Sequence, residues 1–170
     1  ATWGETLDAT REIVSRVRSS AARHGREIGF SLSLRPVIAD TEEAAWQRAE
    51  EIENLVRAAR EQAGLPVTGH QPPNDGSRRL LETATSRRLD ERLWTGVASL
   101  TGAAGNSTGL VGTPEQVADA LVEYYKLGID NFLIRGFEPL EDARVYGRDL
   151  IPLVREKVAA LEAQSSRIAG

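Results

Sequence analysis

Residues 29–46, GFSLSLRPVIADTEEAAW, constrain the fold most, because they describe a strand that leads directly into a helix. Successive side chains of a strand point to opposite sides, which separates apolar from polar residues here. The two sets are Phe30, Leu32 and Leu34 on one face, and Ser31, Ser33 and Arg35 on the other. A strand, a short loop with Pro36 and a helix form the repeating unit of parallel α/β proteins. In a closed (β/α)8 barrel, helices cover the apolar face and inward residues at the carboxyl ends of strands line the active site. The pattern therefore predicts an active-site wall made of the two serines and the arginine.

Composition indicates one globular domain. The 170 residues are 41% hydrophobic and 27% charged, which is typical of a soluble chain. A formal net charge of −4 does not favour nucleic acid as a partner. No apolar run approaches the length of a membrane span, so we expect a cytoplasmic protein without membrane contact.

Cysteine is absent from the sequence, which removes disulfides, thiolate zinc sites and a cysteine nucleophile. The two histidines, His24 and His70, have no ligand partner at useful spacing. We therefore expect no metal site.

Apolar periodicity and capping residues predict the order helix, strand, helix, a long excursion, strand, helix, strand, helix. Helices are expected over residues 6–24, 40–64, 77–92, 113–128 and 140–161, and strands over residues 29–35, 110–111 and 129–136. Asp40 with Glu43, and Thr113 with Gln116, match the capping-box pattern. Pro152 is expected to break or kink the last helix, because proline lacks a backbone donor.

Residues 64–109 are expected to be an insertion. Residues 64–77 hold three prolines and three glycines, which favours an irregular connection. Residues 95–109 are small and glycine-rich, so we expect a mobile loop with little packing, and a linker without function is the alternative. As a lid over an active site, this loop would be defined by Thr101, Gly102, Gly105 and Gly109.

The number of strands is too small for a closed barrel. Such a barrel needs eight strands and about 250 residues. We therefore expect this chain to be the second half of a barrel and to require an amino-terminal half. The alternative is an open, doubly wound sheet, which requires a reversal of strand order that the sequence does not reveal.

Four blocks of the sequence carry a family resemblance. They are TWGE, GFSLSLRPVIADTEEAAW, LWTGV and LVGTPEQVADALVEYYKLGIDNFLIRGFEPLEDARVYGRDLIP. In this order they resemble the carboxyl-terminal half of bacterial luciferase-like flavin monooxygenases, in particular the alkanesulfonate monooxygenase group. The resemblance implies that residues 1–170 are strands six to eight of a (β/α)8 barrel, with their helices and an inserted lid region. It also implies reduced FMN and molecular oxygen as reactants, a separate flavin reductase and a homo-oligomer.

By the same resemblance, the reaction splits an alkanesulfonate into an aldehyde and sulfite. The family's arginine and histidine of strand six fall at Ser33 and Arg35, its loop arginine falls near Thr101, and its tyrosine after strand eight falls at Phe137. Arg35 is our candidate catalytic residue, since a guanidinium can hold an anion through two donors. Candidate substrate- or flavin-binding residues are Trp3, Ser31, Ser33 and Phe137.

Two alternatives remain open at this point. The departures from the family pattern also fit a sulfone monooxygenase or a deazaflavin- or flavin-dependent oxidoreductase of the same superfamily. A half-barrel could instead be a non-catalytic interaction module, because the family places most flavin-phosphate residues in its first half.

Overall fold

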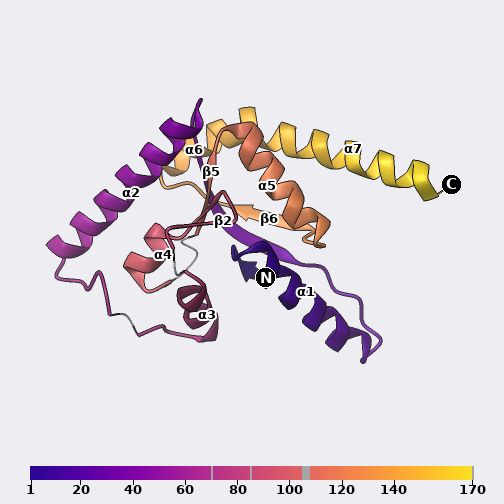
Figure 1. The fold of residues 1–170 in the computed structure, drawn as a ribbon, viewed down its shortest axis with the longest axis horizontal. Helices are drawn as coiled ribbons and strands as arrows, with labels where there is room; N and C mark the ends of the chain where they lie inside the picture. Colours follow the sequence, from indigo (N-terminus) through magenta and orange to yellow (C-terminus); the bar gives the residue numbers. More distant parts are fainter. Residues whose placement is uncertain (70, 85, 105–107, 170) are drawn as a thin grey trace.

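The computed structural model describes residues 1–69, 71–84, 86–104 and 108–169. For residues 168 and 169 it describes the backbone alone. Its sheet is organised around one strand, β2 (Ser31–Ile38), which pairs in parallel with three others. These are β1 (Thr2–Trp3), β5 (Gly109–Gly112) and β6 (Asn131–Ile134). Figure 1 shows β2 crossing the middle of the molecule between these elements.

The backbone hydrogen bonds of β2 define the strand order. Gly4 N donates to Ser33 O over 2.9 Å, and Arg35 N donates to Thr108 O over 2.9 Å, so β1 and β5 share one edge of β2. Leu34 O points to the opposite edge, where it accepts from Arg135 N over 3.3 Å, which is the edge that β6 occupies. The order is therefore β5, β2, β6, whereas consecutive strands of a closed barrel are neighbours. The reversal of strand order that the sequence did not reveal is present around β2.

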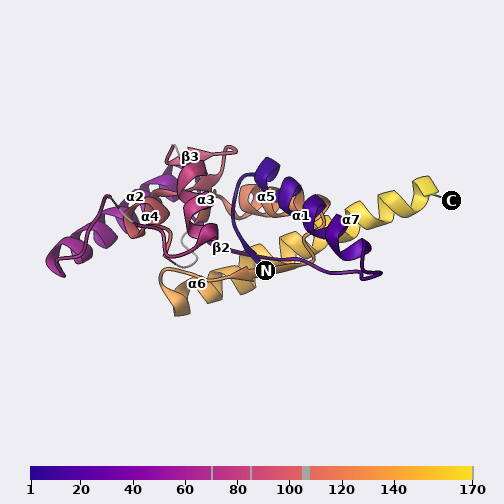
Figure 2. The ribbon, with the colours of Figure 1, turned by 90° about the horizontal axis from the view of Figure 1, so that it is seen from below.

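Helices cover both faces of this sheet, as the reversal requires. Leu32 and Leu34, both fully buried, pack with residues of α1 (Leu7–Ala22), α5 (Pro114–Lys126) and α7 (Ile151–Ala169). Val37 and Val111 belong to the other face, where they pack with α2 (Glu42–Gln62) and α4 (Gly96–Thr101). In Figure 2, α2, α3 and α4 gather at one end of the molecule, and α7 extends past α1 and α5 at the other.

The predicted alternation of β2 is confirmed on its apolar side, but its polar side is not uniformly open. Phe30, Leu32 and Leu34 are buried as expected. On the polar side, Ser31 and Arg35 are half-buried and Ser33 is buried. Val37 lies on the same face of β2 as Ser33 and Arg35. It packs in an apolar cluster under α2, which covers the carboxyl-terminal part of this face.

The helix starts follow the capping signals, with one displacement. Thr113, Pro114 and Gln116 form the predicted capping box of α5, with both reciprocal hydrogen bonds present. Asp40 does not cap α2; Thr41 does, and its Oγ1 accepts from Ala44 N over 3.2 Å. Threonine and aspartate have similar capping tendencies, so two adjacent candidates cannot be ranked from the sequence.

The helix predicted over residues 77–92 is wrong in its second half. Helix α3 (Asp75–Thr83) ends early, and β3 (Arg88–Leu89) and β4 (Leu93–Trp94) form an antiparallel hairpin. Strand β4 then adds to the edge of β5, which buries Leu93 and Trp94. The gain from burying these two side chains outweighs the helical tendency of the charged residues around them.

Several arginines of this segment bind carboxylates from other elements, so they do not form the solvated helix face that the charge pattern suggests. Arg79 binds the buried carboxylate of Glu5 through two nitrogens, at 2.9 and 2.5 Å. Arg87 binds Glu53 over 2.7 Å. The insertion is thereby attached to β1 and to α2.

The mobile loop predicted over residues 95–109 is wrong at both of its ends. Residues 96–101 form α4, in which Val97, Ala98 and Leu100 are buried, and Gly109 belongs to β5. Thr101 ends the helix with its hydroxyl on Val97 O at 2.8 Å, and Gly102 provides the left-handed C-cap with φ 66°. Gly105 lies outside the described residues, so movement of this segment stays a prediction.

The last helical run is interrupted as Pro152 requires. Helix α6 (Pro139–Val145) continues into a π-helical turn, η1 (Tyr146–Leu150), and then into α7. A proline cannot donate to the carbonyl four residues before it and would collide with that carbonyl in a regular helix. The wider turn directly before Pro152 is the predicted break. Helix α7 continues beyond the predicted end at residue 161 and projects from the body (Figure 1). None of the described helices has the length and apolar character that crossing a bilayer requires.

Beyond the end of β6, side chains complete the hydrogen bonding of β2. Pro36 has no N–H, and its carbonyl accepts from the Tyr146 hydroxyl over 2.5 Å. Ile38 O accepts from Arg48 Nη1 over 3.2 Å. The unpaired half of this strand edge is therefore satisfied by α2 and η1, in accordance with the high cost of an unpaired buried carbonyl.

Replacing Tyr146 by phenylalanine leaves Pro36 O without that donor. We expect Tyr146→Phe to lower the free energy of unfolding by about 1–3 kcal/mol, the cost of one buried unsatisfied polar group. Urea denaturation followed by circular dichroism measures this change. Tyr125→Phe is the matched control, because the Tyr125 hydroxyl binds Glu162 on an exposed surface. Equal effects of the two substitutions would contradict the role of Pro36 O.

Candidate functional site

A cavity of about 320 Å³ lies where the carboxyl end of β6 reaches the middle of β2. It is lined by Arg35, Ile134, Arg135, Gly136, Pro139, Ala143 and Tyr146. In (β/α)8 barrels, ligands bind at the carboxyl ends of the strands, and this cavity adjoins the carboxyl end of β6. The position alone makes this cavity a candidate site.

Arg35, the predicted catalytic residue, faces this cavity. Its Nη1 donates to Gly136 O over 2.7 Å, and its Cζ lies 4.9 Å from the centre of the Phe137 ring. Burial, followed by the nearby charge of Arg135, lowers the pKa of Arg35, although a guanidinium remains charged at neutral pH. The side chain is thus held on two sides by the segment that follows β6.

Arg135 brings a second guanidinium to the same cavity. Ile134 is the Cα partner of Leu34, so Arg135 comes level with Arg35 on the neighbouring strand. Arg35 and Arg135 both line this cavity, and arginine side chains can bind an oxyanion because each presents several N–H donors. The sequence does not assign Arg135 to the site, since the register of β6 against β2 determines its position.

Phe137 lies next to Arg35, as the sequence predicts for a site residue. Its ring also contacts Trp94 edge to face, with ring centres 5.8 Å apart and planes at 63°. Trp94 is almost fully buried in the cluster that contains Val37 and Val111. The LWTGV block is the sequence signal for Trp94, whose contribution is to fix the Phe137 ring.

The turn that carries Gly136 and Phe137 is held by a buried carboxylate. Asp142 accepts from Glu138 N over 3.0 Å and from Arg48 Nη2 over 2.6 Å. A Cβ at position 136 would lie 2.2 Å from Asp142 Cβ and Oδ2, so the close approach requires glycine. Arg48 of α2 and Asp142 of α6 therefore hold the turn that follows β6.

Of the predicted site residues, Arg35 is in the lining of this cavity, Phe137 contacts Arg35 from outside the lining, and the others are not in it. Ser31 and Ser33 lie on the same face of β2 as Arg35, further from its carboxyl end, and Trp3 is the Cα partner of Ser33. Trp3 packs with Leu80, Ala98 and Ala103, which is a structural contact with α3 and α4. Gly109 lies level with Arg35 on β5, where a Cβ would approach Arg35 O to 2.7 Å. The structure therefore brings Arg35 and Phe137 together and leaves Trp3, Ser31, Ser33, Thr101 and Gly102 outside that pocket.

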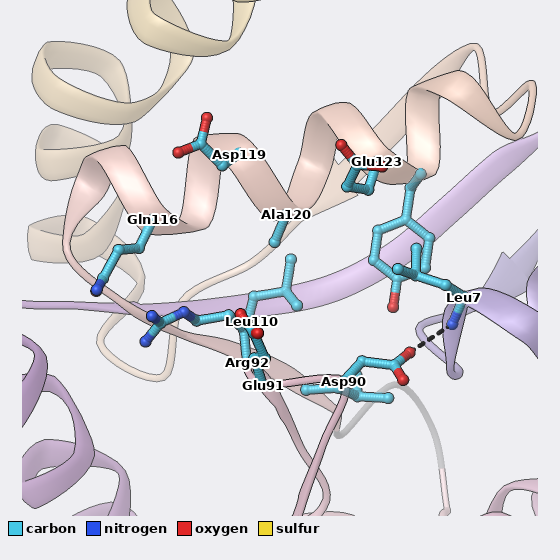
Figure 3. Close-up of a pocket in the computed structure, with 11 residues that line it drawn as sticks. Leu7, Asp90, Glu91, Arg92, Leu110, Gln116, Asp119, Ala120 and Glu123 are labelled. Atoms are coloured by element: carbon cyan, nitrogen blue, oxygen red, sulfur yellow. Dashed lines mark hydrogen bonds between the residues drawn. The ribbon is translucent and has the colours of Figure 1, made fainter.

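A second cavity, of about 420 Å³, lies between α5 and the β3–β4 hairpin (Figure 3). Several of its polar side chains already have partners in the structure. Asp90 accepts from Leu7 N over 2.6 Å, Arg92 binds Glu42 over 2.8 Å, and Asp119 binds Lys157 over 2.8 Å. The described lining has one arginine and four carboxylates, so this cavity does not suit an anion.

No group of three or more histidine, aspartate or glutamate side chains gathers as a metal-ligand set among the described residues.

Comparison with known proteins agrees with this reading of the fold. The family model described as luciferase-like monooxygenase matches residues 1–131. Three solved structures resemble the chain. Riboflavin lyase (RcaE) with modified FMN and riboflavin has a TM-score of 0.60 and 24% identity, over 92% of this chain and 38% of its own. EDTA monooxygenase (EmoA) from Chelativorans sp. BNC1 has a TM-score of 0.59 and 20% identity, over 91% of this chain and 41% of its own. DmoA from Hyphomicrobium sulfonivorans has a TM-score of 0.60 and 21% identity, over 91% of this chain and 36% of its own.

The match over most of its length shows that this chain belongs to the luciferase-like monooxygenase family. The family resemblance seen in the sequence is thereby confirmed. The structural likeness also confirms the α/β class and a partial (β/α)8 barrel, within which β6 lies beside β2 rather than beside β5. The chain spans about two fifths of the length of the structures that it matches.

The described residues fit part of a flavin site. A flavin ring is planar and apolar with polar edges, and the open part of the sheet face offers a corresponding wall. Leu133 is 58% exposed there and is the Cα partner of Ser33, with Arg35 two residues further along β2. Of these residues, the exposed Leu133 and the half-buried Arg35 can contact one side of a flavin.

The contact between Gly136 and Asp142 generates a stability prediction. We expect Gly136→Ala to lower the free energy of unfolding by about 1–3 kcal/mol, because the added methyl group would overlap Asp142. Gly147→Ala is the control, since no atom lies within 4 Å of its added Cβ and its helical position favours alanine by up to about 1 kcal/mol. Thermal denaturation of both variants checks this, and a neutral Gly136→Ala would contradict the close packing.

Glu42 generates a pH prediction. Hydrogen bonds from Arg92 and then from Gln116 lower the pKa of Glu42 from 4.5 to about 2. The stabilisation is therefore complete above the ordinary pKa and is lost as the pH falls through about 2. We expect Glu42→Gln to be less stable than the parent near neutral pH, with a difference that shrinks on acidification. Urea midpoints between pH 2 and 7 measure it, and a constant difference would refute it. Glu43→Gln, an exposed neighbour, is the control.

Proposed function

We propose that this chain forms the carboxyl-terminal part of a reduced-flavin-dependent monooxygenase that oxygenates a small organosulfur compound. The proposed substrate is an alkanesulfonate, and the products are an aldehyde and sulfite. One observation carries the proposal: Arg35 and Arg135 line a single cavity beside the aromatic ring of Phe137.

A sulfonate suits this cavity in charge and in shape. Its three oxygens can accept hydrogen bonds from two guanidinium groups, which favours an anion over a neutral sulfone. Ile134 and Tyr146 supply apolar surface for a short alkyl chain in the same lining. Arg35 would thus hold and orient the reacting end of the substrate.

Reduced FMN, when bound, supplies the electrons with which oxygen is activated. The residues of this chain would provide one wall for it, through the exposed Leu133, and would keep the sulfonate beside that wall through Arg35. A deazaflavin is the alternative cofactor for such a wall. Both expectations rest on family membership and on the exposed sheet face.

Further partners follow from the partial barrel. The amino-terminal half of the barrel would complete the cofactor site, a second copy of the protein would form a homo-oligomer, and a separate reductase would deliver reduced flavin. A cytoplasmic location suits a reductase-dependent enzyme. Coverage of about two fifths of the matched structures supports the need for the missing half.

Anion binding tests the substrate end of the proposal. We expect methanesulfonate to shift the Nε–Hε NMR signals of Arg35 and Arg135, and dimethyl sulfone to leave them unchanged. Arg35→Gln or Arg135→Gln should weaken methanesulfonate binding about tenfold, which corresponds to one lost charge-assisted hydrogen bond. Arg78→Gln, an exposed arginine of α3, is the control. Equal binding of the sulfone and the sulfonate would overturn the proposed substrate class.

The reaction itself is tested in the presence of the amino-terminal half. Native mass spectrometry of the purified protein identifies any bound companion fragment or second copy. With a companion half, reduced FMN and oxygen, we expect sulfite release from an alkanesulfonate together with oxygen uptake. Hydride transfer without oxygen uptake would identify the deazaflavin-type alternative, and neither activity would leave a non-catalytic module.

A further inference from the structure

The geometry points to Arg48 and Asp142 as a positioning pair, which sets the spacing of Arg35 and Arg135 at the oxyanion cavity. This inference rests on the proposed function for its ligand, although the arrangement that it explains is present without one. Neither residue lines the cavity, so both would act through the groups that they hold.

Arg48 connects the end of β2 to α6. Its Nη1 donates to Ile38 O, the last carbonyl of β2, over 3.2 Å, and its Nη2 donates to Asp142 Oδ1 over 2.6 Å. A weaker contact joins Nη2 to Glu138 Oε2 at 3.4 Å. The planar guanidinium of Arg48 therefore links the carboxyl end of β2 to α6, the helix that follows β6.

Asp142 transmits this connection to the turn after β6. Its second oxygen, Oδ2, accepts from Glu138 N over 3.0 Å, and its side chain is 3% exposed. The same oxygen lies where a side chain at position 136 would be, so Asp142 packs closely against Gly136. Glu138 has no side-chain cap for α6, which leaves Asp142 as the polar group that holds this helix start.

The turn held by Asp142 makes two contacts with Arg35. Gly136 O accepts from Arg35, and the Phe137 ring lies under its guanidinium. Arg135 precedes this turn by one residue. A change at Arg48 or Asp142 would therefore move the acceptor, the ring and the second guanidinium relative to β2.

A buried ion pair of this kind contributes little net stability, because desolvation offsets the attraction. Its contribution to geometry is distinct: Arg48 satisfies one carbonyl and one carboxylate at fixed spacing, which a lysine cannot do with a single nitrogen. Structural and positioning roles can thus be separated by experiment.

Arg48→Lys and Asp142→Asn test the inference on the whole chain. We expect each variant to raise the dissociation constant for methanesulfonate about tenfold, the equivalent of one hydrogen bond. We also expect the Nε–Hε signal of Arg35 to shift in the absence of ligand, because the Phe137 ring moves. Glu141→Gln with Arg144→Gln is the matched control, since these residues form an exposed ion pair on the same helix. The control should change neither readout.

The outcomes separate this inference from the proposed function. Folded variants with an unshifted Arg35 signal and unchanged binding would overturn the positioning role. If the parent chain does not bind methanesulfonate, the proposed substrate is wrong, and a shifted Arg35 signal in the variants still supports the positioning pair. Should Asp142→Asn fail to fold, the apolar pair Arg48→Met with Asp142→Leu takes its place, with the same expected shift and the same refuting result.

Discussion

The two edges of β2 are the constraint on which the rest of the structure depends. One edge pairs with β1 and then β5, and the other pairs with β6 over its first half only. Because β6 ends at Ile134, the remaining carbonyls on its side of β2 must find other donors. Tyr146 and Arg48 provide them, from η1 and α2. The need to satisfy a strand edge thus recruits the residues that surround the candidate site.

The reversal of strand order around β2 also explains where the charges gather. It brings the end of β6 beside the middle of β2, so that Arg135 comes level with Arg35. The like charges of Arg35 and Arg135 repel each other, and the lowered pKa of Arg35 reflects burial and that neighbour. An arrangement that holds such groups together is typical of a site that receives an opposite charge. Asp142 forms its ion pair with Arg48, on the neighbouring helix α2.

Much of the candidate site could be predicted from the sequence, for identifiable reasons. Arg35 and Phe137 follow from strand alternation and from their place in the family motif, and the cap of α5 follows from local chemistry. The β3–β4 hairpin and helix α4 could not be predicted, because their stability comes from burying Leu93, Trp94 and Leu100 against distant parts of the chain. Trp3 was expected at the site for the same kind of motif reason, yet packing with α3 and α4 determines its position.

The sequence by itself determined the βα units, the polar and apolar faces of β2, the family, and the absence of cysteine chemistry. These depend on side chains that are near neighbours along the chain, where spacing fixes direction. The tertiary structure alone decided the strand order, the meeting of Arg35 with Arg135, and the link from Arg48 to Asp142. Each of these joins residues that lie about a hundred positions apart, and their proximity depends on the register of strand pairs, which no local pattern encodes.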